Sequence, residues 1–109
     1  MLIGYVTSDL KRICLEQKTA QAELGTDCAK KLRTRLADLQ AAANVTELLS
    51  GRPHPLKGDR KGQFAVDLAR GRRLVFIPTE DPPPKRKDNT TDWSLVTAVT
   101  VVFIGDYHD

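Results

Sequence analysis

The spacing of hydrophobic residues along the chain predicts helices in its first 43 residues. After a short β-branched and aromatic start at 2–6 (LIGYV), apolar residues recur every three or four positions. Residues at that spacing share one face of a helix. We therefore expect a short strand over 2–6, a first helix over about 8–24 and a second over about 27–43, with Gly25 ending the first helix.

From residue 63 the hydrophobic period falls to two, which predicts strands. In the segment 63–69 (QFAVDLA) every second residue is large and apolar, and RLVFI at 73–77 follows a turn at Gly71. These two runs predict an antiparallel hairpin, because glycine allows the positive φ of a tight turn. The nearly continuous apolar run at 94–104 (SLVTAVTVVFI) predicts a third strand inside the sheet, buried on both faces.

The segment at 78–92 (PTEDPPPKRKDNTTD) is polar and contains four of the six prolines, so we expect a flexible loop between two strands. A chain of 109 residues is the size of one domain, here residues 1–109. The predicted order is strand, helix, helix, strand, strand, strand. The predicted fold is therefore α+β, with two N-terminal helices packed on one face of a small, mainly antiparallel twisted sheet.

Positive charge is concentrated in one part of the sequence. Residues 51–77 carry seven Lys and Arg against two acidic residues, whereas 1–50 carry seven against six and 78–109 carry three against six. A compact basic segment in a protein of net charge +3 indicates a localised site for a polyanion. The alternative interpretation is a solvated loop that happens to be basic.

The remaining composition is typical of a cytoplasmic protein. Cys14 and Cys28 both lie in helical apolar patterns without a C-x-x-C spacing, which predicts reduced thiols in the core. The longest apolar run is the four residues 101–104, and the N-terminus does not resemble a secretory leader. We expect a cytoplasmic chain with no membrane partner.

Three stretches carry a resemblance to a known family: HPLKGDRKGQFAVDL at 54–68, RRLVFIP at 72–78 and IGDYHD at 104–109. With the predicted order of elements, they resemble the RelE/ParE superfamily of toxins from type II toxin–antitoxin systems, and within it the HigB-like killer toxins. The resemblance implies a RelE-like fold and a ribosome-dependent endoribonuclease that cuts translated messenger RNA. It also implies a HigA-like helix-turn-helix antitoxin as partner, with operator DNA bound only through the complex of toxin and antitoxin.

RNA cleavage by the ribose 2′-hydroxyl needs a group that accepts the proton, a group that protonates the leaving 5′-oxygen, and cations that stabilise the phosphorane. The two isolated histidines and the scattered acids lack metal-ligand spacing, so we expect neither a metal nor another cofactor. The predicted catalytic residues are Arg73, His108, Tyr107 and Lys57. Arg73 should face the open side of the sheet by alternation, and the resemblance places a functional arginine there. A histidine such as His108 titrates near neutral pH.

Four further residues are predicted to bind RNA or phosphate: His54, Arg60, Lys61 and Arg72. His54 lies between two prolines that restrain its backbone, although it could equally be a turn residue. Arg72 has the opposite strand parity to Arg73, which makes its assignment the weakest of the four.

Two other functions fit the same resemblance. The ParE branch of the superfamily poisons DNA gyrase without catalysis, and a degenerate member would only bind its antitoxin. The basic segment and the DYH ending favour the nuclease over both.

Overall fold

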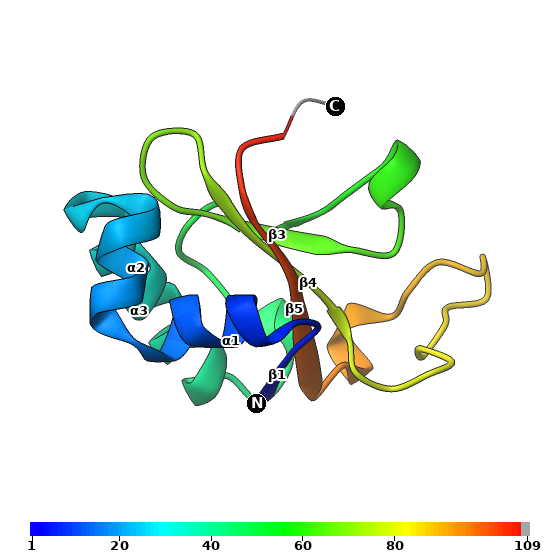
Figure 1. The fold of residues 1–109 in the computed structure, drawn as a ribbon. Coiled ribbons are helices and arrows are strands. Elements are labelled where there is room, and N and C mark those ends of the chain that lie inside the picture. The colour runs from blue at the N-terminus through cyan, green and yellow to red at the C-terminus, as the bar shows by residue number, and fades with distance from the viewer. Residues whose placement is uncertain (108–109) are drawn as a thin grey trace.

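Residues 1–107, the part of the chain that the computed structural model describes, form helices and strands in an α+β arrangement (Figure 1). The α-helices are α1 (Ser8–Leu15), α2 (Gln17–Leu24) and α3 (Thr26–Ala41). The strands are β1 (Leu2–Tyr5), β2 (His54–Pro55), β3 (Phe64–Asp67), β4 (Arg73–Pro78) and β5 (Ala98–Gly105). Short 3-10 turns occur at Val45–Glu47, Gly58–Arg60 and Trp93–Leu95.

The strands form one sheet in the order β1-β5-β4-β3-β2. β1 pairs with β5 in parallel, and the other neighbours are antiparallel. The predicted α+β class and the mainly antiparallel sheet are confirmed. The two-residue strand β2 is additional, since the basic segment before the hairpin was expected to be a loop throughout.

The predicted first helix over 8–24 is wrong in one respect, because it is two helices. Glu16 adopts an extended conformation with φ −114° and ψ 114°, ending α1 and beginning α2. α1 packs against β1 and β5, whereas α2 packs against α3. One straight helix cannot follow both surfaces, and the chain turns at Glu16 to reach them. The second helix was predicted well, at 27–43 against the observed Thr26–Ala41.

The main core lies between the helices and one face of the sheet (Figure 1). Leu74 and Phe76 of β4 are fully buried in it, while Val75 belongs to a second cluster on the other face. This alternation confirms the predicted parity of β4. Trp93 anchors the start of the last strand as expected, because its ring packs 4.9 Å from that of Phe64.

A β-bulge changes the parity of β5 part-way along. Val75 pairs with Phe103, but the next residue of β4, Phe76, pairs with Val101, so that Val102 is extra. Before the bulge, Val101 faces the helices; beyond it, Phe103 belongs to the second cluster. The bulge therefore turns the odd-numbered residues at the end of β5 toward the open face of the sheet.

Both cysteines are free thiols, as expected. Cys28 is fully buried and Cys14 is half-buried, where burial raises the pKa of its thiol to about 12. None of the described helices is both long and apolar enough to cross a membrane.

Candidate active site

A second apolar cluster covers the face of the sheet opposite the helices. Leu56, Ala65 and Val75 are buried in it, and Phe103 and Tyr107 pack against them. The cluster brings together the segment before β3, the hairpin and the C-terminal end of the chain, which are far apart in sequence. These apolar residues form the support on which cationic side chains rest.

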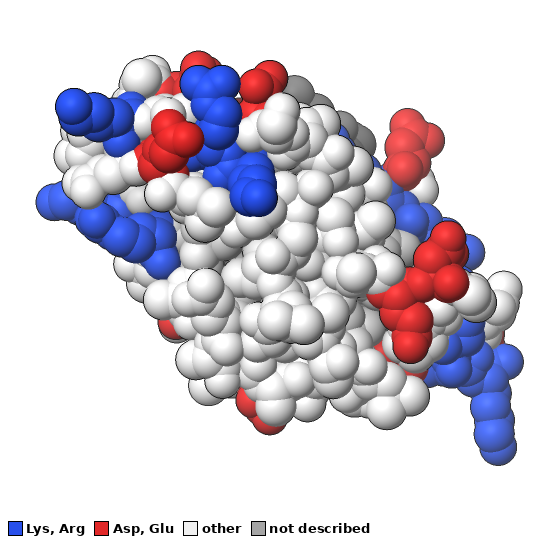
Figure 2. Space-filling model, turned by 60° about the horizontal axis from the view of Figure 1, so that its bottom comes forward, with Lys and Arg blue, Asp and Glu red and all other residues white. Residues whose placement is uncertain are grey.

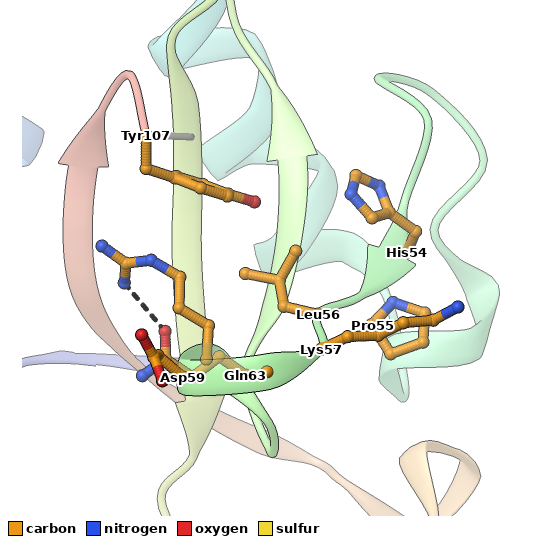
Figure 3. Close-up of a pocket in the computed structure, with 9 residues that line it drawn as sticks. His54, Pro55, Leu56, Lys57, Asp59, Gln63 and Tyr107 are labelled. Atoms are coloured by element: carbon orange, nitrogen blue, oxygen red, sulfur yellow. Dashed lines mark hydrogen bonds between the residues drawn. The ribbon is translucent and has the colours of Figure 1, made fainter. Parts of the chain in front are cut away.

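Arg60 lies over this cluster with its guanidinium on two aromatic rings. Its Cζ atom is 4.4 Å from the ring centre of Phe103 and 4.7 Å from that of Tyr107. Its Nη1 donates a hydrogen bond of 3.0 Å to the side-chain oxygen of Gln63, drawn as a dashed line in Figure 3. Contacts of a guanidinium with aromatic faces hold it in place without neutralising its charge. Arg60 is therefore a positioned cation.

Arg73 approaches the same tyrosine from β4. Its Cζ atom is 4.9 Å from the ring centre of Tyr107, and its Nε donates a hydrogen bond of 3.2 Å to Asp67. The Tyr107 side chain raises the pKa of Arg73, burial opposes this, and Asp67 raises it further. The Arg73 side chain is 24% exposed, so it is held in place yet remains accessible from the open face.

The Tyr107 hydroxyl is buried and has no hydrogen-bond partner within residues 1–107. It points into a pocket, toward the side on which His54 lies (Figure 3). Buried polar groups in native proteins are nearly always paired, so an unpaired one that lines a pocket is expected to bond to a water molecule or to a ligand. Tyr107 can thus offer a hydrogen bond to a bound molecule while two guanidinium groups fix its ring.

The pocket has a volume of about 910 Å³, within the range of small-molecule and nucleotide sites. Its lining comprises His54, Pro55, Leu56, Lys57, Gly58, Asp59, Arg60, Gln63 and Tyr107 (Figure 3). Lys57, Arg60 and His54 supply cationic or hydrogen-bonding groups around one carboxylate. The pocket therefore favours a ligand that combines negative charge with hydrogen-bonding groups.

His54 is restrained in the way its flanking prolines suggested. Its Nδ1 lies 2.6 Å from the backbone oxygen of Arg52. Because a carbonyl oxygen only accepts, Nδ1 donates in this contact, and Nε2 is the ring nitrogen left for another partner. His54 thus lines the pocket with its ring held in place.

Asp67 holds three arginine side chains next to the turn between β3 and β4. Its carboxylate accepts from Arg52 at 2.6 Å and from Arg73 at 3.2 Å, and its backbone oxygen accepts from Arg35 Nε at 3.0 Å. Burial pushes the pKa of Asp67 up, but the two arginines outweigh it and the pKa is lowered. Gly51, with φ +83°, leaves the space this needs, since a Cβ there would lie 2.5 Å from Arg35 Nε.

Asp67 is a site residue that the sequence analysis missed. The signal was available in the hairpin register, because Asp67 and Arg73 are direct partners across β3 and β4. Arg35 of α3, which donates to the backbone oxygen of Asp67, has only 11% of its side chain exposed.

The structure brings together most, but not all, of the predicted site residues. His54, Lys57, Arg60 and Tyr107 line one pocket, and Arg73 contacts Tyr107. Lys61 lines a neighbouring pocket instead. Arg72 lies apart from all of them, because its Nη1 donates a hydrogen bond of 2.8 Å to the backbone oxygen of Leu24 at the end of α2. His108 lies outside the described residues.

The charged side chains are unevenly distributed on the surface as well. The face shown in Figure 2 has a wide centre without them, and its Lys and Arg gather at two ends, over the helices and over the loop between β4 and β5.

Within residues 1–107, no three His, Cys, Asp or Glu side chains lie close enough to hold a metal ion.

Comparison with solved structures finds matches over the full length of the chain. One is the YoeB/ParE toxin from Agrobacterium tumefaciens, with a TM-score of 0.62 and 13% sequence identity over 99% of this chain and 100% of that one. Another is YoeB from Staphylococcus aureus, described as a dimer, with a TM-score of 0.58 and 15% identity over 100% of this chain and 98% of that one. The chain has the fold of the YoeB/ParE toxins. No protein-family model and no curated protein sequence matches it. The expected RelE-like fold is confirmed, and the HigB-like subtype stays a prediction.

Proposed function

We propose that this chain is the toxin of a toxin–antitoxin system, and that it is a ribosome-dependent endoribonuclease acting on translated messenger RNA in the cytoplasm. The observation that carries the proposal is the contact of two guanidinium groups, Arg60 and Arg73, with the single ring of Tyr107, whose buried hydroxyl points into the pocket. The fold shared with the YoeB/ParE toxins supports it.

The proposed reaction is attack of the ribose 2′-oxygen on the adjacent phosphorus, with the 5′-oxygen leaving. The phosphorane gains negative charge, which Arg73 and Arg60 stabilise from fixed positions. Lys57, exposed at the pocket rim, binds the scissile or the neighbouring phosphate. The Tyr107 hydroxyl orients the nucleotide by a hydrogen bond.

Of the two imidazoles in this scheme, one is a candidate for proton transfer and the other for substrate binding. His108 follows Tyr107 directly in the sequence, and we assign it the role of general acid or base. His54 presents Nε2 in the same pocket as Tyr107 and binds the substrate. The proposed partners are the ribosome with its messenger RNA and a HigA-like helix-turn-helix antitoxin, with operator DNA bound only through the complex of toxin and antitoxin.

Induction of the chain in cells without an antitoxin tests the proposal. We expect growth arrest and, by primer extension on several transcripts, new 5′ ends inside reading frames. Arg73→Ala and His108→Gln should abolish both, because one removes a stabilising cation and the other a group that exchanges protons near neutral pH.

Two other outcomes would contradict the nuclease. Absence of new 5′ ends, together with relaxed plasmids and DNA-damage signalling, would identify a gyrase poison. Normal growth of cells that contain the folded chain would identify a member that only binds its antitoxin.

A further inference from the structure

A second pocket adjoins the candidate active site and has no place in the mechanism above. Its volume is about 660 Å³, and it lies between the basic segment and the loop that joins β4 to β5. The lining residues are Pro55, Leu56, Lys57, Gly58, Lys61, Gly62, Lys85, Arg86, Asn89, Thr90, Thr91 and Trp93. Residues 55–58 line both pockets, so the two adjoin along this segment, and Lys57 belongs to both. We refer to this second pocket as the loop groove.

The charged residues that line the loop groove all have the same sign. Lys57 and Lys61 come from the basic segment, Lys85 and Arg86 from the opposite loop, and no Asp or Glu is among the described residues that line it. Four cations along two walls of a groove attract a polyanion strongly, because their fields add in the space between them. The loop, whose charged side chains extend at one end of the molecule in Figure 2, was unassigned by the sequence analysis.

The loop groove also contains an aromatic platform. Trp93 lines it and is half-buried, since its ring packs 4.9 Å from that of Phe64. An aromatic ring held from one side beside a row of cations is the arrangement on which single-stranded nucleic acids stack their bases. Anchoring of β5 and presentation of a ring to the groove are compatible roles for Trp93.

The wall that carries Lys85 and Arg86 is folded before any ligand binds. Lys85 and Thr91 form an antiparallel bridge, and Thr91 is buried. Arg86 N donates to Thr90 O at 2.7 Å, and Asp92 N donates to Pro84 O at 2.9 Å. The expected loop over 78–92 therefore includes a small hairpin, so less conformational entropy is lost on binding.

We propose that the loop groove is a second binding site for single-stranded RNA, which continues the strand beyond the nucleotide held in the first pocket. Lys61, Lys85 and Arg86 bind its phosphates, and a base stacks on Trp93. The proposal rests on the proposed function in taking RNA as the ligand, but it concerns binding alone and does not require cleavage.

Trp93 is the only tryptophan of the chain, so its fluorescence reports on the loop groove directly. The probe is a single-stranded RNA of about twelve nucleotides with 2′-O-methyl groups, which removes the attacking hydroxyl. We expect the RNA to quench Trp93 with the same Kd that anisotropy of a labelled RNA gives. Lys85→Ala and Arg86→Ala should each weaken binding and flatten the log–log salt slope by about 0.7, the value for one phosphate contact of a single strand.

The same loop offers a matched control. Lys87→Ala makes the identical charge change one residue away, but Lys87 does not line the loop groove, so its Kd and salt slope should equal those of the wild type. Binding without a change in Trp93 fluorescence would overturn the proposal, as would an equal loss of affinity in Lys87→Ala. Equal quenching by poly-glutamate would assign the groove to an acidic protein instead.

The outcome is independent of the proposed function. If the chain cuts messages in cells but binds the RNA probe without quenching Trp93 fluorescence, the second site is refuted and the nuclease proposal stands. If the chain cuts nothing, yet RNA quenches Trp93 with the expected dependence on Lys85 and Arg86, the second site stands and the nuclease proposal fails.

Discussion

Arg73 and Tyr107 contact one another across the open face of the sheet, with the guanidinium carbon 4.9 Å from the ring centre. Arg73 begins β4, and Tyr107 lies two residues beyond the end of β5. Their meeting depends on the bulge at Val102, because without it the odd-numbered residues of β5 would continue to face the helices. The position of the candidate site is thus a consequence of one extra residue in a strand.

Alanine variants of Arg73 and Arg72 remove the same charge at different positions, and so test whether cleavage depends on where the arginine lies. Arg73→Ala should slow messenger RNA cleavage by about two to four orders of magnitude, the effect typical of losing a group that stabilises transition-state charge. Its melting temperature should also fall, because the variant loses the hydrogen bond to Asp67 and the contact with Tyr107. Arg72→Ala should lower the melting temperature without slowing cleavage. It removes a hydrogen bond worth about 1 kcal/mol, and so lowers the melting temperature by about 4–8 °C, while cleavage continues.

Cleavage, measured by primer extension, separates the two variants, and circular dichroism checks that both are folded. If Arg72→Ala and Arg73→Ala lose cleavage equally, the loss follows the total charge, and the position of Arg73 in the site has no special role.

Tyr107→Phe separates the hydroxyl from the ring. The hydroxyl is buried without a partner in the described residues, so its removal should leave the melting temperature unchanged or raise it. The ring contacts with Arg60 and Arg73 are kept. If the hydroxyl orients the substrate, cleavage should fall at least about tenfold, as expected for the loss of about 1.4 kcal/mol of transition-state binding. If Tyr107→Phe cleaves as fast as the wild type, the hydroxyl has no role and only the ring of Tyr107 contributes to function.

The strict alternation of inward and outward residues in β4 made the orientation of Arg73 predictable from the sequence. In β4 each residue faces the side opposite its neighbour, so the facing of Arg73 followed once Leu74 and Phe76 were assigned to the core. The run from Val101 to Ile104 has no alternation, because apolar residues pack on both faces of the sheet there. No pattern in the sequence predicted the bulge in this run, and so none predicted the side of the sheet on which Tyr107 lies.

The elements that sequence reasoning missed were those determined by distant contacts. The break at Glu16 contains no glycine or proline, and it follows from the different surfaces that α1 and α2 cover. The hairpin within the loop over 78–92 depends on the pairing of Lys85 with Thr91 and on the burial of Thr91. A polar, proline-rich composition predicts a loop but does not distinguish a folded one from a flexible one.

Asp67 should make the stability of the fold depend on pH in the acidic range. Its pKa is lowered in the folded chain, since Arg52 and Arg73 outweigh the effect of burial. The stabilisation it provides is therefore present above the ordinary aspartate pKa of about 3.9 and is lost as the pH falls through the lower, folded value. By urea unfolding, Asp67→Asn should be less stable than the wild type at pH 7, and the difference should narrow below about pH 4.

Asp59→Asn is the matched control for this measurement, because Asp59 forms no ion pair among the described residues. At pH 7 its stability should differ less from that of the wild type than the stability of Asp67→Asn does. If the difference in free energy of unfolding between the wild type and Asp67→Asn stays the same down to pH 3, the Asp67 carboxylate is not ionised in the pair.

Cys14 should react as a buried thiol, although it is half-exposed by area. Burial raises its pKa to about 12, so at pH 8 its thiolate fraction is about three orders of magnitude below that of an ordinary cysteine with a pKa of about 8.5. In Cys28→Ala, which leaves Cys14 as the only thiol, reaction with a disulfide reagent should be correspondingly slow.

The rate should rise about tenfold per pH unit from pH 8 to pH 10, because a thiol far below its pKa gains thiolate in proportion to hydroxide. In urea the same thiol should react at the ordinary rate and level off near pH 9. A plateau near pH 9 in the folded chain would contradict the raised pKa and the burial that causes it.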